Sequence, residues 1–222
     1  MITEIVPAIL SYDAADAQRK LKIVEPYVHR VQMDVMDGAF VKNTTLSVAD
    51  YGQIKTSLKR EVQLMVSEPE KYIDDCVKYG MDLVEIHIES QKNIWTTIQK
   101  AKNANLKVGI AINPETPAER VRQYLQSADL VLLMSVHPGL GGQVFIPETL
   151  QKIKLLRAMW PSGIIEVDGG LKKGIVGKCA KAGANFMVVG TGIFNAADPL
   201  QALHDLRAEI THPEQQQIVE DA

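Results

Sequence analysis

This sequence has only two cysteines, no long apolar run and no large excess of charge of one sign. Cys76 and Cys179 are its only cysteines, and neither belongs to a Cys-x-x-Cys pair, which excludes a zinc knuckle and a disulfide framework. Both lie in helical patterns, where we expect small core side chains. No apolar run reaches the length of a membrane span, and the N-terminus shows no basic segment followed by an apolar one. We therefore expect a cytoplasmic protein without a membrane partner.

The net charge limits the classes of binding partner that we expect. A formal net charge of −3 over 222 residues gives no reason to expect binding to nucleic acid or to an anionic membrane. With 46% hydrophobic and 23% charged residues, the composition is that of a soluble globular protein. The length suffices for one large domain or two small ones.

Strand and helix patterns alternate along the whole chain. Each short apolar run typical of a strand is followed by a segment with helical periodicity, and the unit recurs roughly every 25 residues. The predicted strands are Ile5–Leu10, Val28–Val35, Glu61–Val66, Asp82–Ile88, Lys107–Ile112, Asp129–Met134, Ile164–Val167 and Phe186–Val189. The predicted helices are Asp13–Val24, Ser47–Leu58, Pro69–Tyr79, Gln91–Ala104, Pro117–Leu125, Pro147–Met159, Lys173–Ala182 and Pro199–Ile210.

Eight such units favour a closed (β/α)8 TIM barrel over the competing arrangement, a doubly wound open sheet. The sequence has no linker, no low-complexity tract and no break in composition. We therefore expect a single domain over residues 1–222, with a polar tail at 212–222 that is frayed.

Two of the predicted strands end in an aspartate. Apolar and polar residues alternate from Val31 to Val35, which indicates a strand with two different faces, and Asp34 lies near its end. The later run from Ile164 ends in Asp168 and two glycines. Because the carboxyl ends of barrel strands meet at one face, we expect both aspartates in one site. The alternative is that each aspartate merely caps the helix that follows it.

Glycines cluster after the sixth, seventh and eighth predicted strands. Glycine lets backbone N–H groups approach an anion closely, and the loops after strands seven and eight of such barrels frequently hold phosphate. The sequence therefore predicts a phosphate site there. The long loop from Ser135 to Ile146 carries three glycines and could close over a ligand. The clusters are Gly139-Leu140-Gly141-Gly142, Asp168-Gly169-Gly170 and Gly190-Thr191-Gly192.

Several segments are shared with one known family. They are Val6–Ser11, Met33–Asn43, Leu64–Glu70, Val84–Glu89, Met134–Phe145, Ile165–Gly170 and Gly190–Phe194. A Met-Asp-Gly run followed later by Pro-Gly-x-Gly-Gly-Gln is highly specific. On these motifs the chain resembles the ribulose-phosphate 3-epimerase family along almost its whole length.

The resemblance implies a (β/α)8 barrel, a sugar-phosphate ligand and a homo-oligomer. The expected reaction is inversion at C3, which interconverts D-ribulose 5-phosphate and D-xylulose 5-phosphate. Asp34 and Asp168 match the family's acid and base, between which a divalent metal lies, and no organic cofactor is expected. Three methionines match an apolar wall near the reacting carbons. The expected substrate-binding residues are Gln63, Met36, Met65, Met134, Gly139, Leu140, Gly141, Gly142, Gly169, Gly170, Gly190 and Thr191.

Three polar positions of the family differ here. Gln32 and Gln63 stand where the family carries histidines that bind the metal, and Ala8 stands where a serine usually contacts substrate. Neutral glutamine is a poorer zinc ligand than imidazole. We therefore expect a metal to be weakly bound or absent, with Asp34 and Asp168 as its ligands if one is bound. The glutamine N–H2 groups could instead donate hydrogen bonds to a developing oxyanion.

The histidines offer few substitutes as ligands. His87 ends the fourth predicted strand and either lies at the edge of the pocket or is a structural histidine. His137 lies in the loop after the sixth predicted strand and either is solvated or enters the pocket when that loop closes. The others, His29, His204 and His212, fall away from the catalytic face of a barrel.

Three functions remain open from the sequence. The first is a 3-epimerase that works with a weakly held metal or none. The second is a diverged enzyme acting on another phosphosugar, and the third is a phosphosugar-binding protein without catalysis. Retention of both aspartates favours the first two, and loss of both histidines favours the last two.

Overall fold

The computed structural model describes residues 2–90 and 93–211. Its strands are β1 (Glu4–Ile9), β2 (Arg30–Met36), β3 (Lys59–Met65), β4 (Leu83–His87), β5 (Lys107–Ile112), β6 (Leu130–Met134), β7 (Ile165–Asp168) and β8 (Phe186–Val189). Its α-helices are α1 (Ala14–Val24), α2 (Val48–Gln53), α3 (Ile73–Lys78), α4 (Trp95–Asn103), α5 (Thr149–Met159), α6 (Val176–Ala182), α7 (Thr191–Phe194) and α8 (Pro199–Thr211). Two 3₁₀ helices complete the fold, η1 (Pro69–Tyr72) and η2 (Ala118–Tyr124).

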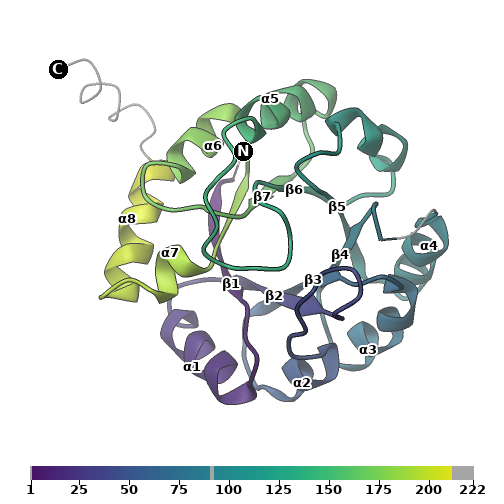
Figure 1. Ribbon diagram of the computed structural model, residues 1–222, viewed down its shortest axis with the longest axis horizontal. Helices are drawn as coiled ribbons and strands as arrows, with labels where there is room; N and C mark the ends of the chain where they lie inside the picture. Colours follow the sequence, from purple (N-terminus) through teal and green to yellow (C-terminus); the bar gives the residue numbers. More distant parts are fainter. Residues whose placement is uncertain (1, 91–92, 212–222) are drawn as a thin grey trace.

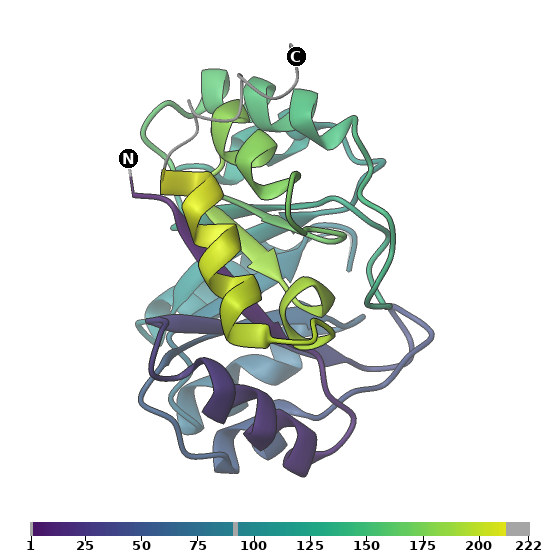
Figure 2. The ribbon, with the colours of Figure 1, turned by 90° about the vertical axis from the view of Figure 1, so that its left-hand side faces the viewer.

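The strands form a closed parallel barrel in sequence order, which confirms the predicted (β/α)8 architecture. The ring closes where β1 pairs with β8, with Glu4 opposite Phe186 and Pro7 opposite Val189. Figure 1 looks along the barrel and shows the strands around its centre and the helices outside them. Figure 2 shows α8 and the short α7 on the flank of the barrel, with β1 behind α8.

Alternation along the strands separates two cores. On β2, for example, Val31, Met33 and Val35 face outward and join the large apolar core beneath the helices. Gln32 and Asp34 take the positions between them and are buried inside the ring. A smaller apolar cluster, made largely by β1, β5, β6 and β8, fills part of the barrel interior. The period of two in the sequence thus decides which residues enter the barrel.

Local signals explain where the helices begin. Asp13 accepts a hydrogen bond from the Asp16 N–H at the start of α1. Ser47 and Asp50 form a reciprocal capping box at the start of α2. Such caps satisfy backbone N–H groups that have no partner within the helix.

Three predicted helices differ most from the structure. The helix expected at 69–79 begins as the 3₁₀ helix η1 and continues as α3. The helix expected at 47–58 ends at Gln53, because Ile54 takes an extended conformation and is buried. The helix expected at 117–125 is the 3₁₀ helix η2. Its buried residues Ala118, Val121 and Tyr124 recur every third position, which matches three residues per turn.

Other expectations fall partly outside the described chain. The predicted frayed tail at 212–222 lies outside the described residues, as does the start of the helix expected from Gln91. Within residues 2–90 and 93–211, no helix is long and apolar enough to cross a membrane.

The Tyr51 hydroxyl ties α2 to the barrel, and its removal should weaken the fold. Tyr51 is fully buried, and its Oη donates to the Ile9 carbonyl at 2.6 Å. We expect Tyr51→Phe to lower the free energy of unfolding by about 1–3 kcal/mol, because a buried acceptor loses its donor. Urea unfolding measures this change. Tyr27→Phe, at a ring that is half exposed, is the matched control. Equal stability of both variants would contradict the role given to Tyr51.

Candidate active site

A cavity of about 240 Å³ opens at the carboxyl ends of the strands. Ala8 of β1, the position where the family usually has a serine, lies on the cavity wall. Asp34, Gln63 and Asp168 reach the cavity from three other strands. The loop after β6 crosses over the centre of the ring in Figure 1 and covers part of the cavity. The cavity is also lined by the remaining residues expected to bind substrate, which are Met36, Met65, Met134, Gly139, Leu140, Gly141, Gly142, Gly169, Gly170, Gly190 and Thr191.

One amide group bridges the two aspartates. Gln32 Nε2 donates to Asp34 Oδ1 at 2.8 Å and to Asp168 Oδ2 at 3.1 Å. The end of the Gln63 amide also lies 3.1 Å from Gln32 Nε2. These four side chains come from β2, β3 and β7, so residues 136 positions apart meet in one network. The alternative that each aspartate only caps a helix is wrong, because both face the cavity and share a donor.

Burial shapes the charge of this pair. Desolvation raises the pKa of Asp34 to about 6, against the lowering effect of the Gln32 hydrogen bond. Desolvation and the neighbouring Asp34 charge raise the pKa of Asp168 to about 8. Two carboxylates without a counter-ion between them resist being ionised together. Both raised pKa values favour a pair that shares one proton around neutral pH.

The residues present do not fit a metal ion between the aspartates. Gln32 turns an N–H2 group toward both carboxylates, and that group repels a cation. Its Oε1, the atom that could bind a metal, is buried and has no hydrogen-bond partner among the described residues. The donor set thus differs in kind from a set of imidazoles and carboxylates.

His87 and His137 occupy different environments. His87 is fully buried, and its Nε2 lies 3.2 Å from Gln63 Nε2. Its ring packs against Phe40 at an interplanar angle of 52°. His137 is on the cavity rim, but its ring is largely exposed and lies 3.0 Å from Glu115. His87 therefore touches the network around the aspartates, whereas His137 faces solvent.

The glycine loops bring the backbone close to the cavity. Gly169 and Gly170 have φ values of +119° and +65°, which side chains rarely adopt. A Cβ at Gly170 would also lie 2.4 Å from the Phe145 N atom, so the loop after β6 packs directly on this turn. Asn43 Nδ2 donates to the Gly139 carbonyl at 2.6 Å and ties that loop to the one after β2.

Sequence reasoning missed a charged wall contributed by α1. Lys20 lines the cavity, and its Nζ donates to the Leu10 carbonyl at 2.6 Å and forms an ion pair with Asp16 at 2.6 Å. Tyr12 lies on the same wall. No sequence motif marks these residues: Lys20 reaches the cavity from α1, and Tyr12 reaches it from the segment between β1 and α1.

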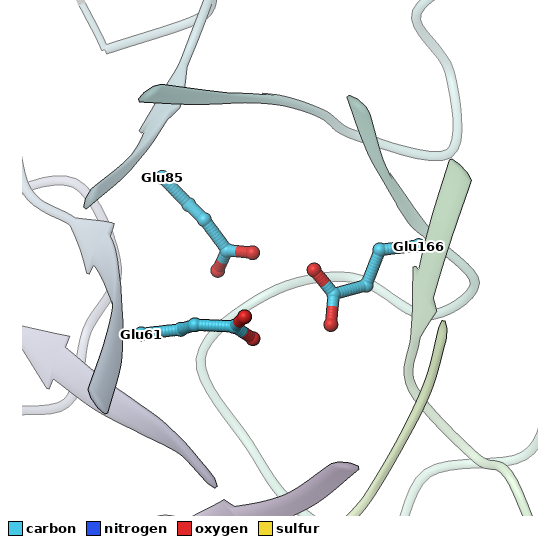
Figure 3. A group of neighbouring side chains, drawn as sticks. All are labelled: Glu61, Glu85 and Glu166. Carbon is cyan, nitrogen blue, oxygen red and sulfur yellow. The ribbon is translucent and has the colours of Figure 1, made fainter. Parts of the chain in front are cut away.

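A layer of three glutamates lies beneath the aspartates and was also missed. Glu61 and Glu166 precede Gln63 and Asp168 by two residues, so they point into the barrel one layer deeper. Figure 3 shows Glu61, Glu85 and Glu166 pointing toward one another, and each offers an oxygen within 4.8 Å of the others. Within the part of the chain that the structure describes, this is the one group of acidic, cysteine or histidine side chains spaced for a metal ion.

The glutamate layer has more acid groups than its surroundings can pair. Arg30 bonds to Glu61 at the base of the barrel. The oxygens of Glu85 and Glu166 are buried, and no N–H or hydroxyl group of the described residues donates to them. Burial raises the pKa of both groups well above the usual range, so a proton held by one can be shared with the other. The sequence did carry a sign of this layer, because each glutamate is a polar residue within an otherwise apolar predicted strand.

Comparisons with known proteins agree with this geometry. The profile of the Ribulose-phosphate 3 epimerase family matches residues 4–194. The chain is 39% identical over 212 residues to "Ribulose-phosphate 3-epimerase" of Synechocystis sp., covering 91% of this chain and 92% of that protein. It is 36% identical to the protein of the same name from Bacillus subtilis, covering 92% and 98%.

Solved structures with lower identity share the fold alone. One is a 3-hexulose-6-phosphate synthase, with a TM-score of 0.70 and 22% identity, covering 95% of this chain and 100% of that one. Another is KGPDC from Streptococcus mutans, with a TM-score of 0.71 and 12% identity, covering 96% and 100%.

The raised pKa of Asp168 predicts a pH-dependent stability. Its value is 3.8 when unperturbed and about 8 in the fold. The stabilisation from its bound proton is therefore complete below about pH 4 and is lost as the pH rises toward 8. Asp168→Asn removes this loss. Relative to the natural chain, the variant should gain up to about 1.4 kcal/mol of unfolding free energy per pH unit across that window.

Urea unfolding at several pH values measures the gain. Asp50→Asn is the control, because hydrogen bonds from Ser47 lower the pKa of Asp50 and its titration falls below the window. A constant difference between Asp168→Asn and the natural chain would refute the raised pKa.

Proposed function

The chain belongs to the ribulose-phosphate 3-epimerase family, and we propose that it is an isomerase that interconverts D-ribulose 5-phosphate and D-xylulose 5-phosphate. The observation that carries this proposal is a pair of aspartates that face one cavity, Asp34 buried and Asp168 partly buried, and that are linked by one amide. A protein that only binds sugar phosphates has no need of such a pair.

The reaction requires an acid and a base at the same time. The C3 proton of the ketopentose is acidified by the neighbouring C2 carbonyl, and its removal gives an enediolate. Return of a proton to the opposite face of C3 inverts the centre. Two carboxyl groups from different strands, one ionised and one protonated, are suited to this exchange.

The environments of the two aspartates favour one assignment. With a pKa of about 6, Asp34 is mostly ionised at neutral pH and acts as the base. With a pKa of about 8, Asp168 is mostly protonated and acts as the acid. After one turnover the proton has moved from Asp168 to Asp34, which is the state that the reverse epimerisation uses.

Amide groups take over the stabilisation of the enediolate. The donor set between the aspartates does not fit a metal ion. Gln32 N–H2 lies between the carboxylates and is a preorganised donor for charge that develops beside them. A neutral donor stabilises an oxyanion less than a divalent cation does, so we expect slower turnover than a metal site would give.

The rest of the cavity suits a short phosphosugar. Met36, Met65 and Met134 form a buried apolar wall that excludes water from the reacting carbons. The glycine turns after β7 and β8 lie at the positions where barrels often bind phosphate. We assign phosphate to the backbone around Gly170 and Gly190. The homo-oligomer stays a prediction from the family resemblance.

Solvent exchange tests the catalytic pair. In heavy water with ribulose 5-phosphate, the natural chain should incorporate deuterium at C3 and form xylulose 5-phosphate. Asp34→Asn and Asp168→Asn should each lower the rate by about a thousandfold, because each removes an acid or base. NMR of the sugar follows both events. Binding without exchange would identify a non-catalytic binding protein, and full activity in both variants would exclude the pair.

Chelation tests the metal-free route. Activity of the natural chain should be unchanged after treatment with a strong chelator. The matched variant is Gln32→His combined with Gln63→His, which should bind zinc more tightly and become sensitive to chelator. Activity of the natural chain that vanished with chelator and returned with added metal would show that a metal ion serves this site.

Substitution at Gly190 tests the phosphate assignment. A Cβ at this position would lie 3.6 Å from the Ala8 Cβ, which is ordinary contact, so Gly190→Ala should still bind. Gly190→Asp adds bulk and negative charge and should reduce affinity for ribulose 5-phosphate at least tenfold by electrostatic repulsion. Calorimetry measures both. Equal affinities of the two variants would show that phosphate binds at a place other than Gly190.

A further inference from the structure

One cation stands on the wall of the cavity, and the acid and base chemistry gives it no role. Within the part of the chain that the structure describes, Lys20 is the one lysine or arginine that lines this cavity. It comes from α1, outside the barrel, and its Nζ reaches the end of β1. Its side chain is only 15% exposed, so its charge is screened less than that of a surface lysine.

Three partners hold the Lys20 ammonium in place. Its Nζ donates to the Leu10 carbonyl at 2.6 Å and to Ser11 Oγ at 3.2 Å. It also forms the ion pair with Asp16 at 2.6 Å. An ammonium has three N–H donors, so these partners can use all of them. Lys20 is therefore a fixed point charge on the wall rather than a flexible arm.

Asp16 does not cancel this charge, because it binds a second cation. Arg19 Nη2 lies 2.6 Å from Asp16 Oδ1, on the opposite carboxylate oxygen from Lys20. Two cations and one anion leave the cluster with a net charge of +1. Arg19 is 58% exposed and does not line the cavity. Lys20 is therefore the cation that the cluster presents to a ligand.

The Lys20 ammonium lies beside the loops to which we assign phosphate. Its Nζ is 5.8 Å from the ring centroid of Phe194, the last residue of α7, and α7 follows directly on the turn after β8. A Cβ added to Gly141 would lie 4.0 Å from Leu10 Cδ1 and 3.6 Å from Thr191 Cγ2. The end of β1, the loop after β6 and the start of α7 thus meet next to Lys20.

We propose that Lys20 is a specificity-determining residue, whose fixed positive charge selects phosphorylated ligands over neutral sugars. This inference rests on the proposed function, because it concerns the phosphate site of the same cavity. A phosphate monoester carries about two negative charges at neutral pH, whereas the backbone N–H groups of the glycine turns supply only partial positive charges. Asp16, Asp34 and Asp168 also line the cavity, so a cation is needed to offset their repulsion of an anion.

Neutralisation of Lys20 should weaken the binding of phosphorylated ligands. Lys20→Met keeps most of the aliphatic side chain and removes the charge. We expect its affinity for ribulose 5-phosphate, measured by calorimetry, to be lower by about tenfold or more, because a charge close to the phosphate is lost. Lys20→Arg keeps a positive charge and should recover most of the affinity.

Arg19→Met is the matched control. It removes the other cation of Asp16 without changing the cavity wall, so affinity should stay within about twofold of the natural value. Urea unfolding of each variant measures any loss of stability. A Lys20 that merely ties α1 to β1 would lose stability without losing affinity. Equal affinities of Lys20→Met and Arg19→Met would overturn the inference.

Salt and steady-state kinetics separate recognition from chemistry. The affinity of the natural chain for ribulose 5-phosphate should fall as salt is added, and that of Lys20→Met should fall less steeply, because one screened attraction is missing. The KM of Lys20→Met should rise by about tenfold, while kcat changes by less than about threefold. A loss confined to kcat would place Lys20 at the reacting carbons and overturn the inference.

Inorganic phosphate separates this inference from the proposed function, because its binding requires no turnover. It should bind the natural chain more tightly than Lys20→Met. A chain that shows this difference but does not epimerise would contradict only the proposed function. An active epimerase whose Lys20→Met variant binds phosphate and ribulose 5-phosphate as tightly as the natural chain would contradict only the inference. A natural chain that bound neither ligand would contradict both.

Discussion

Burial of Asp34 and Asp168 in one cavity is the constraint on which the rest of the site depends. Desolvation is the largest influence on both carboxyl groups and raises the pKa of each. The side chains around them suit a pair of acids that shares one proton. Gln32 supplies donors to whichever oxygens are ionised, and the methionine wall keeps the surroundings apolar.

Acid groups are also buried deeper in the barrel, in the layer below the two aspartates. Strands β2, β3, β4 and β7 contribute polar side chains to the interior, whereas β1, β5, β6 and β8 contribute mainly apolar ones. Glu85 and Glu166 therefore face few groups that could stabilise a charge. Gly109 on β5 leaves room for Glu85, since a Cβ there would lie 2.8 Å from the Glu85 Cγ. This uneven interior concentrates acid groups on one side of the barrel, where burial raises the pKa of Glu85 and Glu166.

The glutamines change what the aspartates must do. Imidazoles at positions 32 and 63 would hold a cation, and a cation would keep both carboxylates ionised. An amide has a donor and an acceptor end, so it can satisfy one ionised and one protonated carboxyl group at once. Gln32 and Gln63 thus form one consistent change from imidazole to amide, at two side chains that lie in contact.

The sequence by itself determined the barrel, because eight strand and helix periods leave few other closed arrangements. It also determined that Asp34, Asp168 and the glycine turns meet at one face, since strand ends of a parallel barrel converge. Only the tertiary structure decided which groups touch. The link from His87 through Gln63 to the aspartates, and the glutamate layer below, depend on the register between strands that are distant in sequence. The alternation within one strand predicts whether a side chain points into the barrel or outward. It does not predict which side chain of the neighbouring strand lies beside it.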